Sequence, residues 1–127
     1  MASRLRHIAI IVKDPEKSAQ FFEQAFGMTR AGNARRGIYM SDGVINVALL
    51  KQANEKERLG LYHFGMWVDD LDAAEKQVTA AGGTYLDGRP DSPLSFYECK
   101  YRDPEGVVFD LTHNGWAGAA KEVEVKA

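Results

Sequence analysis

Hydrophobic and polar residues follow one pattern in two separate parts of the chain. Residues 7–12 and 63–68 are short runs of β-branched and other apolar residues, and each predicts a strand. Placing His7 over His63 gives an offset of 56 residues (63 − 7 = 56). The same offset superposes further identical pairs: Val12 on Val68, Asp14 on Asp70, Ala25 on Ala81 and Gly27 on Gly83. Several matches at one offset and in one order indicate an internal duplication.

Each predicted strand is followed by an acidic turn and then by a segment in which apolar residues recur at helical spacing. We expect these helices at about 15–26 and 71–81, with Asp14 and Asp70 as N-caps and Pro15 at the first helical position. Glycine follows both segments, where helix C-caps favour it. Both halves of the chain therefore begin with a strand and a capped helix.

Shorter strands complete each half. We expect them at about 28–32, 37–40 and 44–50, and again at 84–86, 95–102 and 107–112, with turns at 41–43 and 103–106. A single domain is then expected over 1–127: module one at about 4–51, a polar linker at 52–60, module two at 61–116, and a loose tail or weak helix at 117–127. Two βαβββ modules predict an α+β fold, in which each helix covers one face of a mixed sheet and the opposite face is buried or lines a cavity.

Composition narrows the class of protein. A length of 127 residues suits one core rather than two. The formal net charge of -2 does not suggest the clustered basic face of a nucleic-acid-binding protein, and no apolar run is long enough to cross a membrane. The single cysteine, Cys99, excludes an internal disulfide and is interpreted as buried filler. We therefore expect a cytoplasmic protein whose partners include neither nucleic acid nor a membrane.

Candidate chemistry concentrates on three side chains. Because residues alternate between the faces of a strand, His7 and His63 lie on the face away from the predicted helix in both modules. Asp110 lies between apolar neighbours in the last predicted strand, where a carboxylate is costly unless it is paired or binds a metal. Two imidazoles and one carboxylate predict a metal site with open positions. The alternative is that the histidines are structural; the third histidine, His113, is expected in a surface loop.

The order of these residues resembles the vicinal oxygen chelate superfamily of glyoxalases, bleomycin resistance proteins and extradiol dioxygenases. The resemblance spans about 4–116, and its most specific part is the run from Asp103 to Leu111, Asp-Pro-Glu-Gly-Val-Val-Phe-Asp-Leu. It implies an open, cup-shaped mixed sheet with helices on its outer face, around one divalent metal bound by His7, His63 and Asp110. Fe(II) is favoured, with Mn, Ni, Co or Zn as alternatives. A small-molecule substrate and a homodimer are also implied.

Among the activities of these proteins, a dioxygenase-like one is favoured. Glyoxalases and epimerases use a fourth protein ligand, and aligning the two turn glycines places its counterpart at Val47, or at Ala48 after a slip of one residue. Neither can bind a metal, and Asn46 would reach the site only through a bulge. Three ligands resemble the extradiol dioxygenases, although Lys100 stands where they carry tyrosine. Alternatives are an antibiotic-sequestering binder without catalysis, a glyoxalase-type lyase or isomerase, or addition to an epoxide antibiotic.

Three further side chains are candidates for the cup. Trp67 shares the face of His63 and is expected either to form an aromatic wall for a substrate or to fill the core. Glu98 and Lys100 alternate with less charged neighbours, so they are expected to face the cup or solvent. Lys100 is a candidate proton donor or anion clamp, and the alternative is that the two form a solvated ion pair.

Overall fold

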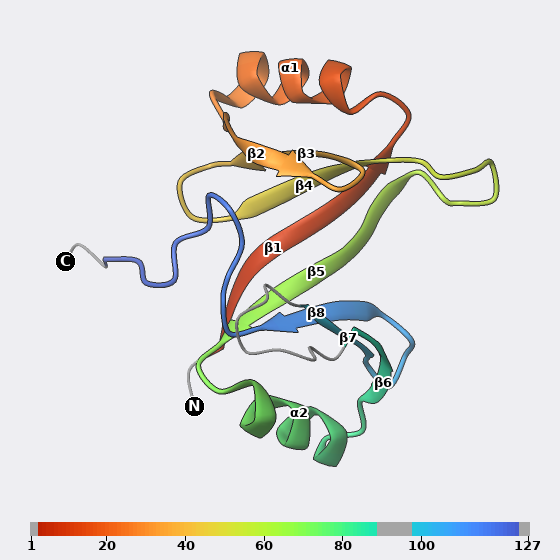
Figure 1. The fold of residues 1–127 in the computed structure, drawn as a ribbon, viewed down its shortest axis with the longest axis vertical. Coiled ribbons are helices and arrows are strands. Elements are labelled where there is room, and N and C mark those ends of the chain that lie inside the picture. The colour runs from red at the N-terminus through yellow and green to blue at the C-terminus, as the bar shows by residue number, and fades with distance from the viewer. Residues whose placement is uncertain (1–2, 89–97, 125–127) are drawn as a thin grey trace.

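The computed structural model describes residues 3–88 and 98–124, and its elements repeat in the two halves (Figure 1). The first half contains β1 (Ser3–Val12), α1 (Pro15–Phe26), β2 (Thr29–Ala34), β3 (Gly37–Ser41) and β4 (Asn46–Lys51). The second contains β5 (Gly60–Val68), α2 (Leu71–Ala80), β6 (Thr84–Asp87), β7 (Cys99–Arg102) and β8 (Val108–Thr112). Residues 95–97 of the seventh expected strand lie outside the described residues.

The eight strands of the described residues belong to one mixed sheet with the order β2-β3-β4-β1-β5-β8-β7-β6. Strand β1 runs parallel to β4, and β5 runs parallel to β8 in the same arrangement. The modules join where β1 and β5 pair antiparallel, so they pair within one chain. Figure 1 shows α1 beside β2 to β4 at one end of the molecule and α2 beside β6 to β8 at the other. The predicted α+β fold of two βαβββ modules is confirmed.

The helices begin as the sequence predicts. Asp14 and Asp70 are the N-caps, and each carboxylate accepts a backbone hydrogen bond three residues further on. Helix α1 ends at Gly27, whose φ of 67° lies in the left-handed region that favours glycine. Helix α2 ends one residue earlier than expected, and its C-cap is Ala81 rather than glycine. Neither helix is long and apolar enough to span a membrane, nor is any other within the described ranges.

Two apolar clusters fill the space between the helices and the sheet. Each helix packs on its own module, and Cys99 is fully buried in the second cluster, as expected of filler. The first cluster is built from Ala19, Met40 and Leu49, and the second from Val68, Leu71, Ala74, Cys99, Tyr101, Phe109 and Leu111. The buried polar residues are His7, Ser41, Asn46, His63, Asp110 and Thr112. Since helices already cover the apolar face, the polar groups gather on the other face of the sheet.

The described end of the chain differs from the loose tail or weak helix expected at 117–127, of which residues 125–127 lie outside the described residues. Residues 113–122, here called the C-terminal strap, form turns, bends and irregular backbone without a helix. Positive φ angles of 76° at Gly115 and 78° at Gly118 interrupt any helical run. The strap is bonded along its length to both modules: Ala120 N donates to Val44 O, Arg6 Nε donates to Ala120 O, and Lys121 pairs with Asp69.

Candidate metal centre

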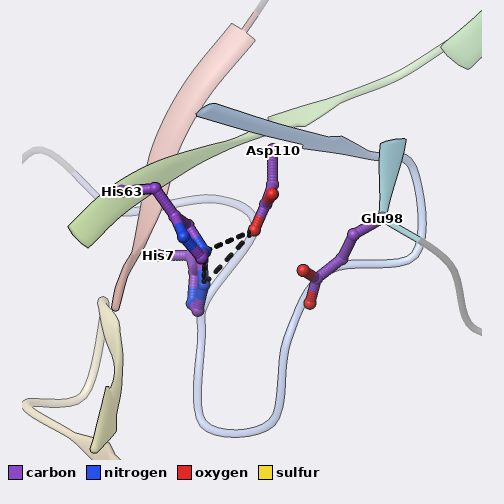
Figure 2. A group of neighbouring side chains, drawn as sticks. All are labelled: His7, His63, Glu98 and Asp110. Carbon is purple, nitrogen blue, oxygen red and sulfur yellow. Dashed lines mark hydrogen bonds and ion pairs between the residues drawn. The ribbon is translucent and has the colours of Figure 1, made fainter. Parts of the chain in front are cut away.

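His7, His63 and Asp110 come together on the polar face of the sheet, where β1, β5 and β8 are neighbours (Figure 2). His7 Nε2 lies 3.3 Å from His63 Nε2, and Asp110 Oδ2 lies 2.8 Å from His63 Nε2 and 3.5 Å from His7 Nε2. The three residues are 2%, 8% and 0% exposed. Strand register explains the convergence, because Gly65 pairs with His7 on one side and with Asp110 on the other.

A β-bulge precedes each histidine. The pairing of β1 with β5 skips Arg6 just before His7 and skips Tyr62 just before His63. These positions are equivalent in the duplication, since 6 + 56 = 62. A bulge redirects the side chains around it. The ring of Tyr62 accordingly lies edge-on to that of His63, with centroids 4.4 Å apart, and Arg6 reaches the strap.

Asn46 fixes the tautomer of His7. Its Nδ2 donates to the carbonyl of Ala117 at 2.7 Å, which turns its Oδ1 towards His7 Nδ1, also at 2.7 Å. That oxygen can only accept, so His7 Nδ1 carries the hydrogen and His7 Nε2 presents a lone pair towards His63 and Asp110. Burial lowers the pKa of His7 to about 4, against the opposing effects of Asn46 and Asp110. The imidazole is therefore neutral at neutral pH, as a metal ligand must be.

The donor set fits a divalent metal. Two buried atoms of the cluster, His63 Nδ1 and Asp110 Oδ2, have no hydrogen-bond partner within the described residues. Asp110 Oδ2 is the one of these atoms that lies beside both Nε2 atoms, and a buried carboxylate oxygen without a hydrogen-bond donor is costly unless a cation neutralises it. With metal–ligand distances of about 2.0–2.2 Å, neighbouring ligand atoms are roughly 2.8–3.1 Å apart in octahedral sites and roughly 3.3–3.6 Å apart in tetrahedral sites. The separations around His7 Nε2, His63 Nε2 and Asp110 Oδ2 are close to these values.

Glu98 and Lys100 face this cluster, and the ion pair expected between them forms at its edge with both side chains partly exposed. Lys100 Nζ lies 2.6 Å from Asp110 Oδ1 and 3.6 Å from Glu98 Oε2. Glu98 Oε1 accepts a hydrogen bond from Trp116 Nε1 at 2.8 Å. His7, His63, Glu98 and Asp110 each offer one ligand atom within 4.8 Å of the others, so this group could hold a metal ion (Figure 2).

Burial and neighbouring charges shift the pKa values of the ionisable groups in this cluster. Burial and the neighbouring Asp110 raise the pKa of Glu98 to about 7, although Lys100 and Trp116 oppose this. Burial alone would raise the pKa of Asp110, but its contacts with His63 and Glu98 and the charge of Lys100 hold that pKa below its ordinary value. Burial also opposes the charge of Lys100, and the pKa of Lys100 is nevertheless raised by Asp110 and Glu98. The site therefore combines an ionised carboxylate, an ammonium group and a second carboxyl group that can change protonation near neutral pH.

The alignment of the last strands of the two modules needs a correction of one residue. Val47 pairs with Ile8, and Phe109 pairs with Phe64, which is the repeat equivalent of Ile8. The counterpart of Asp110 is therefore Ala48, not Val47, because the first module has one more residue between its turn glycine and this position. Ala48 cannot bind a metal. Asn46 lies on the same strand face as Ala48 and needs no bulge to reach the site, where it binds His7.

The two tryptophans lie differently with respect to the candidate centre. Trp67, expected to form an aromatic wall or to fill the core, is half-buried against the strap, donates a hydrogen bond to His113 O at 3.2 Å and packs on Gly115. Trp116, which no strand or helix pattern singled out, stacks on His7 with ring centroids 4.7 Å apart and planes 9° from parallel. His113 is exposed, as expected.

The fold and the polar cluster define a cup of two βαβββ modules with a metal-type donor set. Residues 4–111 match the family described as the Glyoxalase/Bleomycin resistance protein/Dioxygenase superfamily, and the chain belongs to this superfamily. Glutathione transferase FosA from Serratia marcescens is 25% identical over 117 residues, covering 87% of this chain and 81% of FosA. The predicted family is confirmed.

Solved structures with the same fold include a hypothetical protein and an epimerase. The hypothetical protein BH1468 from Bacillus halodurans has a TM-score of 0.72 at 16% identity, over 99% of this chain and 100% of that protein. A methylmalonyl-CoA epimerase variant from Streptomyces coelicolor, in complex with 2-nitronate-propionyl-CoA, has a TM-score of 0.66 at 20% identity, over 85% of this chain and 94% of the epimerase. At these identities the likeness concerns the fold alone.

Proposed function

We propose that the protein is a divalent-metal-dependent enzyme that binds a small substrate through its oxygen atoms. The observation that carries this proposal is the convergence of His7 Nε2, His63 Nε2 and Asp110 Oδ2, with no hydrogen bond to that oxygen from the described residues. These three residues would hold the metal, for which Fe(II), Mn, Co, Ni and Zn all suit imidazole and carboxylate ligands. When bound, the metal acts as a Lewis acid that polarises a substrate oxygen.

Glu98 supports a proton-transfer reaction of the glyoxalase type, as a lyase or an isomerase. A general base works best when its pKa lies near the working pH, and the pKa of Glu98 is raised to about 7. The carboxyl group adjoins the ligand cluster, so a substrate held there would lie within its reach. Lys100 would balance negative charge that develops on the substrate. Ala48 cannot serve as a fourth metal ligand. This matters less for the proton-transfer activity, because Glu98, the residue just before β7, supplies a carboxylate beside the ligand cluster.

A dioxygenase-like activity is the second candidate. It is favoured by the three ligand atoms His7 Nε2, His63 Nε2 and Asp110 Oδ2, which lie within 3.5 Å of one another. Three protein ligands leave positions for a bidentate substrate such as a catechol, and Fe(II) would be the metal. Lys100, which stays an ammonium group, would then stabilise the negative charge of an ionised substrate hydroxyl. Pure sequestration of a small molecule is disfavoured, since it would not require converging imidazoles and a buried carboxylate.

Metal binding and chemistry are tested separately. Metal-free protein is titrated with Fe(II), Mn(II), Co(II) and Zn(II) without air, and His63→Ala is compared with His113→Ala. The second variant is a matched control, because it removes an exposed imidazole. We expect wild type and His113→Ala to bind one ion per chain and His63→Ala to lose it. Wild-type protein that binds none of these ions would contradict the proposal and favour a binder.

Glu98→Gln distinguishes the two reactions. Loaded protein is screened for deuterium exchange next to the carbonyl of hydroxycarbonyl and thioester compounds, and for oxygen uptake with catechols. Proton exchange that disappears in Glu98→Gln, with metal content unchanged, is the expected result. Oxygen uptake by the Fe(II) form, retained in this variant, would instead support the dioxygenase.

A further inference from the structure

Trp116 touches two members of the candidate metal centre at once. Its indole stacks on the imidazole of His7, with ring centroids 4.7 Å apart, and its Nε1 donates to Glu98 Oε1 at 2.8 Å. The side chain is only 5% exposed, although it belongs to a segment without regular secondary structure. One side chain of the C-terminal strap therefore connects a candidate ligand with the candidate base.

The sheet leaves room for this indole at Gly65. A Cβ on Gly65 would lie 2.6 Å from Trp116 Cζ2 and 3.0 Å from His7 Cβ, closer than packed atoms allow. Gly65 has no positive φ, so its lack of a side chain serves close approach rather than an unusual backbone conformation. The strap itself also fits closely, because a Cβ on Gly118 would lie 2.7 Å from the Cβ of Ser41. Glycines thus shape both sides of the contact.

Hydrogen bonds hold the strap on both sides of Trp116. Trp67 Nε1 donates to His113 O before it, and Asn46 Nδ2 and Ser41 Oγ donate to the carbonyls of Ala117 and Gly118 after it. Asn46 also binds His7 Nδ1. His7 is consequently held in two ways. The indole fixes the plane of its ring, and the hydrogen bond to Asn46 fixes the direction of its Nδ1 and its tautomer. Both constraints depend on the strap. Figure 2 shows this segment curving past the cluster.

We propose that Trp116 is a positioning residue of the metal centre, through which the C-terminal strap sets the affinity for metal and the orientation of Glu98. This inference rests on the proposed function, because it takes His7 as a ligand. An imidazole whose plane is fixed presents its Nε2 lone pair in one direction, so less conformational freedom is lost when a metal binds. A carboxyl group held by the indole N–H likewise keeps one position beside the substrate.

Two substitutions separate the contacts. Trp116→Phe keeps an aromatic ring over His7 but cannot donate to Glu98, whereas Trp116→Leu removes both contacts. We expect Trp116→Leu to lower Co(II) affinity by about 10- to 100-fold and to alter the visible absorption spectrum of the bound ion. Trp116→Phe should keep the affinity and spectrum and lose turnover only.

Trp67→Leu is the matched control, because it removes an indole that bonds to the same strap at His113 O. It should lower Co(II) affinity less than Trp116→Leu does and leave the spectrum unchanged. If Trp67→Leu and Trp116→Leu lower the affinity equally, the strap acts only through general stability, and the inference is overturned.

NMR of metal-free protein tests the contact between Trp116 and His7 independently of metal binding. The stacked indole should shift the ring protons of His7 by its ring current, and Trp116→Leu should abolish this shift while Trp67→Leu preserves it. Wild-type protein that fails to bind metal would refute the proposed function, but the shift would still support the positioning contact. His7 signals that do not respond to Trp116→Leu would refute the contact whether or not metal binds.

Discussion

Both the Oδ1 and the Nδ2 of Asn46 form hydrogen bonds, so replacing Asn46 tests how the orientation of His7 is set. The side chain is 0% exposed, and its bonds to His7 Nδ1 and Ala117 O are both 2.7 Å long. Asn46→Ala leaves the buried Nδ1–H of His7 without its partner and also removes the bond to the carbonyl of Ala117, an exposed residue. One unpaired buried group costs about 1–3 kcal/mol, so the free energy of unfolding should fall by roughly that amount. Metal affinity should fall by about 10- to 100-fold, because the His7 ring loses its fixed tautomer.

Asn46→Asp separates the loss of stability from the loss of metal affinity. A carboxylate can still accept the hydrogen of His7 Nδ1, but it cannot donate to Ala117 O. We therefore expect Asn46→Asp to keep most of the metal affinity while losing stability. Ser41→Ala is the control for the strap, because Ser41 Oγ donates to Gly118 O at 2.6 Å and belongs to no ligand contact. Urea unfolding of metal-free protein and calorimetric titration with Zn(II) measure the two quantities.

One result would refute this reasoning. If Asn46→Ala weakens metal binding no more than Ser41→Ala does, the amide acts only through the strap and does not orient His7. Equal losses of affinity in Asn46→Ala and Asn46→Asp would also contradict it, because an acceptor for His7 Nδ1 remains in only one of them.

Three other outcomes are expected. Lys100→Met removes the ammonium group 2.6 Å from Asp110 Oδ1 and should keep the metal content measured by elemental analysis, while turnover falls on the order of 10²-fold; loss of metal would contradict this. Burial raises the pKa of Tyr101 from 10.0 to about 12, so its stabilising effect is complete below pH 10 and is lost as the pH rises towards 12. Chemical unfolding should show this decline in wild type but not in Tyr101→Phe, and identical profiles would refute it. A homodimer is expected, consistent with 58% exposure of Phe21 and 68% of Phe26, and sedimentation showing a monomer at micromolar concentration would disprove it.

The histidines could be predicted because duplicated strands repeat the same alternation of faces. A strand has a period of two, so the face of His7 follows from its position among Ala9 and Ile11, and His63 follows by equivalence. Asp110 was detectable as a carboxylate between Phe109 and Leu111. In these cases, local pattern and tertiary structure depend on the same physical constraint, namely that one face of the sheet packs beneath a helix.

Other parts of the site depend on contacts that periodicity does not encode. The environment of Lys100 follows from its pairing with Asp110 across β7 and β8. Trp116 lies in irregular backbone, whose path is set by hydrogen bonds to distant residues rather than by its own sequence. One signal was available, because a glycine inside a strand, here Gly65, often marks the close approach of another group. The role of Asn46 was obscured by an alignment that differed by one residue.

The paired bulges at Arg6 and Tyr62 constrain how this chain can change in length. A strand turns its side chains to opposite faces at every step, so an unbalanced deletion within β1 or β5 would carry a histidine from the polar face towards a helix. The polar connection at 52–59 is less restricted, since it contains no strand and its backbone bond to β1 is that of Gln52 N to Val12 O at its start. Insertions and deletions are therefore tolerated between the modules, whereas the ligand strands can evolve only by substitution. The two copies have diverged in most of their residues, yet the spacing of bulge and histidine is the same in both.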